Sequence, residues 1–335
     1  MTAKDSKMEH FKAIVFLLAA GLLFGACGDN DGELADDEGF SDQQIVTDYV
    51  DQVILPTYTT LDDRAETLLT AVEALESDPT DTNLEAARDA WIQTRSPWEQ
   101  SEAALFGPVD SNGYDPALDS WPVNQNDLDA VLDSDDELTQ EYVQGLDPGL
   151  KGFHTIEYLL FGEGGTKTAA DFTDREFDYL VASTQELKRI TGQLEASWTT
   201  GVDGNPPYAE TFKTAGTEGN NTFPSEAAAG EQIISGMVII ADEVANGKVA
   251  DPYNERDTTL VESQFSYNSL TDFKNNIRGI ENAYLGRMEE AGTDGKGITE
   301  YVKEQDGELD QRVRTEIEAA ITALDEVPEP FRDSI

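Results

Sequence analysis

His154 and Glu157 are the residues whose types and spacing are best suited to chemistry in this chain. Only two histidines occur among the 335 residues, and His154 stands in Gly-Phe-His-Thr-Ile-Glu, three residues before Glu157. On a helix, side chains at this spacing lie on one face and can contact each other. An imidazole and a carboxylate placed in this way can share a metal ion, transfer a proton, or simply satisfy each other inside a folded protein.

The scarcity of histidine excludes several kinds of site within one chain. The other histidine, His10, belongs to a segment that we expect to be removed during export. The zinc-peptidase motif H-E-x-x-H is absent, and Tyr158 occupies the second histidine position of its inverted form. Di-iron bundles need two Glu-x-x-His helices. What remains is one imidazole among carboxylates, a ligand set that suits iron, calcium, manganese or weakly held zinc.

Three glutamates stand near predicted helix ends. Glu102, Glu157 and Glu281 are each followed five residues later by a glycine, which can end a helix in the left-handed conformation. The helix dipole disfavours a carboxylate in that position. We therefore expect each glutamate either to be exposed to solvent or to need a compensating arginine, lysine or metal ion.

The net charge of −46 excludes nucleic acid as a partner, because phosphate binding needs a basic face. The acids are spread along the whole chain, so we interpret them mainly as a solvated, self-repelling surface. Single acids must therefore be assigned a function from their position.

The N-terminus predicts an exported lipoprotein. Three lysines precede an apolar run over residues 13–26, which is too short to cross a bilayer and has the length of a signal-peptide core. The run ends directly before Cys27, the only cysteine. We predict a signal peptide over 1–26, lipidation of Cys27, and a disordered acidic tether over 27–40. Gly28 follows Cys27 where an inner-membrane retention signal would have aspartate, which favours the outer membrane. The lipid would be the chain's only membrane contact.

Apolar residues recur at helical spacing almost throughout, and no alternating run predicts a strand. We therefore predict an all-α protein built from two helical-bundle domains, 41–165 and 166–335, with the break in the glycine-rich stretch 162–168. The expected helical segments are 45–75, 84–105, 125–132, 150–161, 174–198, 225–246, 270–285 and 305–326.

The motif around His154 resembles the G-x-H-x-x-E signature of the imelysin-like family, also called peptidase M75. This family includes insulin-cleaving metalloproteinases and iron-regulated bacterial envelope proteins. Other segments are similar to the family in the right order, so that the resemblance covers about residues 41–330. They are Ala90-Trp91 with Arg95, the stretch 98–107, the D-x-W-P loop at 119–123, and the stretch 272–286.

The resemblance implies two bundle-like, duplicated domains with the His/Glu motif near their interface. It implies metal ligands among the polar residues of a cleft, namely His154, Glu157, Glu102, Glu99 and Asp119. Trp121 and Arg278 are expected to contact a bound cofactor in the same cleft. Arg278 is also expected to neutralise the helix-end glutamates.

Two functions follow as alternatives. The first is an envelope lipoprotein that binds a divalent metal (iron, calcium or zinc) or a small iron-containing ligand for uptake, together with other envelope uptake proteins. The second is a metallopeptidase in which His154 and Glu157 are catalytic. A single imidazole is weak support for a firmly held catalytic metal, which favours the binding function.

Overall fold

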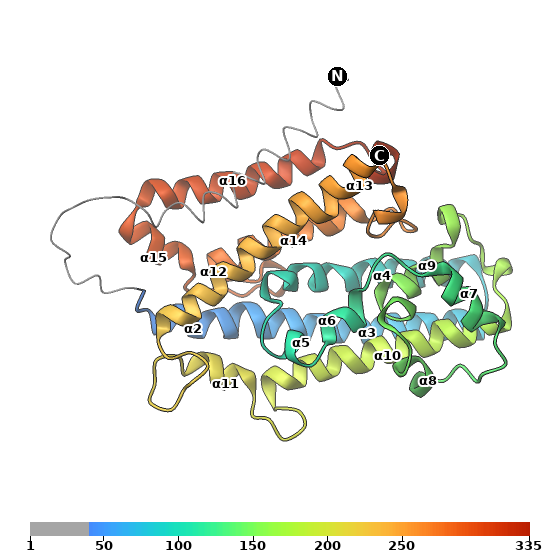
Figure 1. The fold of residues 1–335 in the computed structure, drawn as a ribbon, viewed down its shortest axis with the longest axis horizontal. Helices are drawn as coiled ribbons and strands as arrows, with labels where there is room; N and C mark the ends of the chain where they lie inside the picture. The colour runs from blue at the N-terminus through green and yellow to red at the C-terminus, as the bar shows by residue number, and fades with distance from the viewer. Residues whose placement is uncertain (1–39) are drawn as a thin grey trace.

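The computed structural model describes residues 40–335, and these residues form helices and connecting loops without any strand (Figure 1), which confirms the all-α prediction. The predicted signal peptide, the lipidation site Cys27 and the tether up to residue 39 lie outside the described residues. None of the described helices is long and apolar enough to cross a membrane. The α-helices are α2 (Gln43–Asp48), α3 (Leu55–Ser77), α4 (Asp81–Ser101), α5 (Pro108–Ser111), α6 (Tyr114–Asp119), α7 (Gln125–Asp133), α8 (Gln140–Gln144), α9 (Phe153–Phe161), α10 (Asp174–Thr199), α11 (Tyr208–Lys213), α12 (Glu226–Asp242), α13 (Asp251–Glu255), α14 (Ser269–Leu285), α15 (Ile298–Gln305) and α16 (Gly307–Asp325).

Helices α3, α4, α9 and α10 form one layer, in which α3 packs most extensively on α4 and α10. Leu61, Leu68 and Val72 recur at helical spacing on α3, and all three are completely buried. This apolar stripe makes burial of one helix face favourable. Threonine side chains accept hydrogen bonds at the start of α4 and α10, which fixes where each helix begins.

Helices α12, α14, α15 and α16 lie on the other side of α4 (Figure 1), and α14 packs against both α4 and α16. Glycine is required where this second layer meets α4. A Cβ atom on Gly279 of α14 would lie 2.3 Å from the carbonyl oxygen of Gln100, and one on Gly236 of α12 would lie 2.1 Å from that of Ala103. The two glycines therefore let α14 dock closely on the C-terminal end of α4, and α12 on the 3-10 turn Glu102–Ala104 that follows it.

The hydrophobic core is continuous across the predicted domain boundary. Helix α10 belongs to the predicted C-terminal domain, yet it packs along α3 of the predicted N-terminal domain. The glycine-rich stretch begins with Gly162, which ends α9 with a φ of +67°. The division into 41–165 and 166–335 stays a prediction.

Candidate metal centre

His154 lies in the first turn of α9, with 2% of its surface exposed. Gly152, the first residue of the motif, precedes this helix with a φ of +80° and packs against α6. A Cβ atom at this position would lie 2.2 Å from the carbonyl oxygen of Leu118. Asp119 is the next residue and ends α6. The glycine therefore lets the start of α9 approach the end of α6 until His154 contacts Asp119.

Glu157 holds the imidazole of His154 in one orientation. Its Oε2 lies 2.9 Å from Nδ1, and its Oε1 accepts hydrogen bonds of 2.7–3.0 Å from Phe265 N, Ser266 N and Ser266 Oγ. A carboxylate only accepts hydrogen bonds, so Nδ1 carries the hydrogen atom of this pair. The other nitrogen, Nε2, lies 3.1 Å from Asp119 Oδ1 and 3.9 Å from Glu262 Oε1 without an aligned hydrogen bond.

Arg95 is a completely buried cation at the centre of the cluster. Its guanidinium pairs with Glu99 and Asp119, and Nη2 lies 2.9 Å from Glu262 Oε1. Asp272 Oδ2 lies 3.6 Å from the same Nη2. One guanidinium therefore fixes carboxylates from α4, α6, α14 and the segment before α14.

Lys248, from the π-helical turn Glu243–Ala250, is a second buried cation. Its Nζ lies 2.7 Å from Glu102 Oε2, 3.3 Å from Glu99 Oε2 and 3.1 Å from Glu262 Oε2. Asn276 of α14 donates from Nδ2 to Glu99 Oε2 and Glu102 Oε2 at 2.7 Å each. The cation that compensates Glu102 at the end of α4 is therefore a lysine.

Negative charge exceeds positive charge in this cluster. Although burial disfavours the imidazolium, contacts with the Asp119 and Glu157 carboxylates raise the pKa of His154 to about 10. Burial raises the pKa of Glu99 to about 8 and that of Glu102 well above its usual value. Burial acts in the same direction on Asp119, but Arg95 and His154 hold the pKa of Asp119 well below its usual range. Six buried carboxylates surround Arg95, Lys248 and His154: Glu99, Glu102, Asp119, Glu157, Glu262 and Asp272.

Two overlapping groups of side chains bring their ligand atoms within 4.8 Å of one another. The first contains Asp119, His154 and Glu262, and the second contains Glu99, Glu102, Asp119 and Glu262. The ammonium of Lys248 contacts three members of the second group, and the guanidinium of Arg95 contacts both carboxylates of the first group. The first group offers an imidazole nitrogen and two carboxylates, which is a donor set that iron, zinc and manganese accept.

The structure brings together four residues that the sequence predicted as metal ligands, namely Glu99, Glu102, Asp119 and His154. Glu157 contacts His154, yet both of its oxygens already accept hydrogen bonds. A role for Glu157 as a direct ligand stays a prediction.

Trp121 and Arg278, the two predicted cofactor contacts, lie in different places. The half-buried ring of Trp121 lies 6.4 Å from the imidazole of His154, centroid to centroid, and 5.4 Å from Lys248 Nζ. Arg278 is exposed and lines a separate cavity beside Glu281. A cofactor contact by either residue stays a prediction.

Sequence reasoning missed Glu262 and Lys248. Glu262 lies in an irregular segment between the short 3-10 turn Thr258–Leu260 and α14, without any motif around it. Lys248 lies just beyond the predicted helix 225–246, in a π-helical turn without any motif around it. The sequence did indicate that Glu102 needs a compensating cation. That indication does not specify which lysine, arginine or metal ion supplies the charge.

Comparisons with known proteins identify the family of this chain. The family model described as Imelysin, peptidase M75, matches residues 54–335. The chain is 31% identical over 313 residues to Iron-regulated protein A of Synechococcus elongatus, a match that covers 93% of this chain and 82% of that protein.

Two solved structures are similar to this one. An iron-regulated protein A precursor from Parabacteroides distasonis superposes with a TM-score of 0.78 at 29% identity, covering 90% of this chain and 89% of that one. An imelysin-like protein from Psychrobacter arcticum has a TM-score of 0.58 at 11% identity, covering 88% and 97%, and shares the fold. The chain therefore belongs to the imelysin family, peptidase M75.

Proposed function

We propose that this protein binds one divalent metal ion between His154, Asp119 and Glu262. The observation that carries the proposal is the position of His154 Nε2. Glu157 fixes the hydrogen atom on Nδ1, and Nε2 is buried 3.1 Å from a carboxylate oxygen without an aligned hydrogen bond. Carboxylates orient metal-binding histidines in this way, with one ring nitrogen paired and the other left for the ion.

The charge of the cluster supports the same proposal. The centre compensates its excess of carboxylates partly by holding protons, as the raised pKa values of Glu99 and His154 show. A divalent cation would replace such protons, because metal ligands bind in their deprotonated forms.

The burial of the ligands favours a bare ion as cargo over a larger iron-containing ligand. Asp119, His154 and Glu262 expose 5%, 2% and 0% of their surfaces. Arg95 and Lys248 would hold the carboxylates apart and in place, and Trp121 would cover the imidazole. Iron is the first cation to test, because two similar proteins carry the words iron-regulated in their names.

We place this function in the bacterial envelope, with the domain anchored in the outer membrane through Cys27 and cooperating with envelope uptake proteins. The signal-peptide pattern before Cys27 supports this localisation. Metabolic labelling with a radioactive fatty acid should label the wild-type chain and leave Cys27→Ser unlabelled. Labelling of both would contradict the anchor.

The metallopeptidase alternative receives less support from the same geometry. Glu157 would have to serve as the general base, but its oxygens accept four hydrogen bonds from His154, Phe265 and Ser266. A general base must reach the proton that it removes. Peptide cleavage that is lost in Glu157→Gln would revive this alternative.

Calorimetry on the purified full chain tests the metal proposal. Ferrous iron, manganese, zinc and calcium should be compared under anaerobic conditions. We expect one ion per chain in the wild type and a loss of about tenfold to 100-fold in affinity in His154→Ala. Equal affinity in the two proteins would overturn the proposal. Binding of a haem-type compound in place of any bare ion would do the same.

A further inference from the structure

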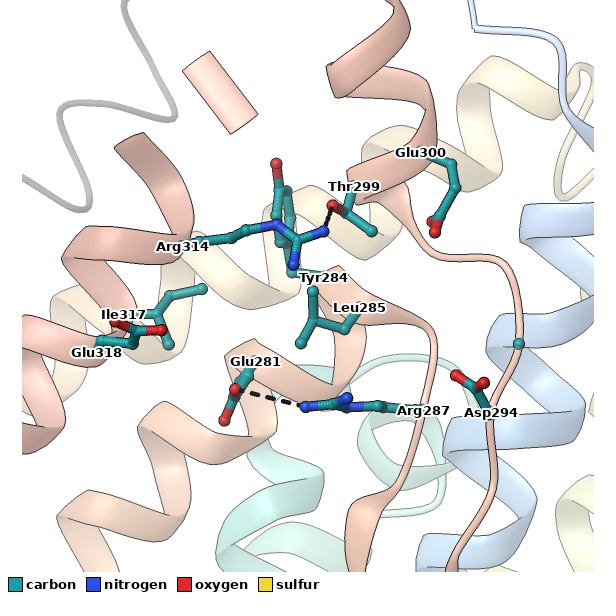
Figure 2. A pocket seen from close by; sticks show the side chains of 11 residues that line it. Glu281, Tyr284, Leu285, Arg287, Asp294, Thr299, Glu300, Arg314, Ile317 and Glu318 are labelled. Carbon is teal, nitrogen blue, oxygen red and sulfur yellow. Dashed lines mark hydrogen bonds and ion pairs between the residues drawn. The ribbon is translucent and has the colours of Figure 1, made fainter. Parts of the chain in front are cut away.

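A second cavity, separate from the metal centre, lies where α14, α15 and α16 meet, and its volume is about 260 Å³ (Figure 2). Drug-sized ligands occupy cavities of about 300–1,000 Å³, so this one suits a smaller metabolite. Its lining combines two arginines, four acids and the apolar surfaces of Leu285 and Ile317. Figure 2 shows the arginines above and below Leu285, with acids on both flanks. The charged lining residues are Arg287, Arg314, Glu281, Asp294, Glu300 and Glu318.

Arg314 is held in place before any ligand arrives. Its Nη2 donates to Thr299 Oγ1 at 2.6 Å, and its Nε lies 3.2 Å from both oxygens of Asp310. Asp310 in turn accepts hydrogen bonds from Tyr284 and Thr299 at 3.0 and 2.6 Å. The charge of Arg314 is therefore largely balanced by Asp310.

Arg287 has no such partner. Its Nε is buried without a hydrogen-bond acceptor among residues 40–335, although 39% of the side chain as a whole is exposed. The one carboxylate paired with its guanidinium among these residues, Glu281, is 3.9 Å from Nη2. A buried donor without an acceptor is unfavourable. This atom therefore indicates a place for an acceptor such as a carboxylate.

The acids of the cavity indicate a place for donors. Asp294 and Glu318 form no hydrogen bond or ion pair through their side chains with any other residue between 40 and 335. Glu300 uses one oxygen to accept from Gly297 N at 2.8 Å. Four acids line the cavity against two arginines, so that the lining has an excess of two negative charges.

The wall beside α15 is fixed in position. Gly286 has a φ of +71°, and a Cβ atom on it would lie 2.7 Å from Gly297 N. Lys296 N donates to Asp48 Oδ2 at 2.8 Å, which ties this wall to α2. The cavity is therefore preformed, as metabolite sites usually are.

We propose that this cavity binds a cationic amino acid, represented by lysine. The α-carboxylate would pair with Arg287, and the two ammonium groups would pair with the unpartnered acids. An anion alone would be repelled by the excess of carboxylates, and a simple cation would leave Arg287 Nε unpaired. A molecule with one carboxylate and a net positive charge satisfies both requirements. This site does not depend on the metal centre.

Calorimetric titration of the purified full chain with L-lysine tests this proposal, with cadaverine and glutamate as comparison ligands. Cadaverine has both ammonium groups and no carboxylate, whereas glutamate has a net negative charge. We expect one lysine per chain, with cadaverine bound at least about tenfold more weakly and glutamate more weakly still. Lysine binding should persist in His154→Ala.

Arg287→Gln should lower the affinity for lysine about tenfold or more and leave the affinity for cadaverine unchanged. Arg312→Gln is the matched control, because Arg312 is exposed on α16 and does not line the cavity. Both variants should keep the melting temperature of the wild type. The proposal is overturned if about 10 mM lysine shows no binding to the wild type. Equal binding of lysine and cadaverine would also overturn it, as would equal affinity in Arg287→Gln.

Discussion

His154 Nδ1 and Glu157 Oε2 lie 2.9 Å apart, and this contact turns His154 Nε2 toward Asp119. The two residues of the motif therefore have different positions in the centre. His154 faces the carboxylates, whereas Glu157 lies behind the imidazole and is itself held by Phe265 and Ser266. This arrangement leads to predictions that separate the two roles.

Glu157→Gln should weaken metal binding about tenfold to 100-fold, because the amide no longer fixes the hydrogen atom on Nδ1. Calorimetry with ferrous iron or zinc measures the change. Glu281→Gln is a suitable control, since Glu281 has the same five-residue spacing to a glycine but lies in a different cavity. An unchanged affinity in Glu157→Gln would show that Glu157 does not position His154.

Lys248→Met should allow a second metal ion to bind. The ammonium lies between Glu99, Glu102 and Glu262, whose oxygens together with Asp119 form the second group of ligand atoms. Removing one partner of a buried ion pair costs about 3–5 kcal/mol, so the metal-free variant should also be less stable. Elemental analysis should count two ions per chain in the variant and one in the wild type.

Lys274→Met serves as the control for this experiment, because Lys274 pairs with the exposed Asp325 at 2.9 Å. One ion per chain in all three proteins would mean that Lys248 does not occupy a metal position.

The stability of the metal-free chain should fall as the pH rises from about 6 to about 9. The pKa of Glu99 is about 8 in the folded chain against 4.5 normally, and the pKa of His154 is about 10 against 6.5. The folded chain therefore holds protons that the unfolded chain has released. The contribution of Glu99 is lost between pH 4.5 and 8, and that of His154 between pH 6.5 and 10.

Melting temperatures measured across this range check the prediction. Bound metal should make the melting temperature depend less on pH, because the ion replaces the protons held by Glu99 and His154. His154→Ala should also have a smaller slope than the wild type, and an identical slope would refute the contribution of His154.

Gly152→Ala should destabilise the fold by about 1–3 kcal/mol or more, because it combines a positive φ with a close contact. The added Cβ atom would lie 2.2 Å from the carbonyl oxygen of Leu118. Metal affinity should fall as well, because relieving the contact must move the start of α9 away from α6 and so separate His154 from Asp119. Gly149→Ala is the control, because nothing lies within 4 Å of its Cβ position. Urea denaturation that gives equal stabilities for the two variants would contradict this role of Gly152.

The helices could largely be predicted from the sequence, because a buried apolar stripe recurs at the period of the helix itself. The segments predicted over 174–198 and 270–285 are α10 (Asp174–Thr199) and α14 (Ser269–Leu285). The prediction for 150–161 began too early, since Gly152 adopts a positive φ and α9 starts at Phe153. The expected helical segments leave residues 106–124 unassigned. This stretch contains the short helices α5 and α6, whose few turns have no recognisable period.

Some residues of the candidate site could likewise be predicted from the sequence, and others could not. Local spacing was sufficient to pair His154 with Glu157, because both lie on one turn of one helix. The positions of Glu262 and Lys248 depend on how the second layer docks on α4, where Gly279 and Gly236 permit close contact. Neither Glu262 nor Lys248 belongs to a repeating sequence pattern that would predict its position. Only the tertiary structure therefore decided which charges surround His154, because burial and charge pairing arise between segments far apart in the chain.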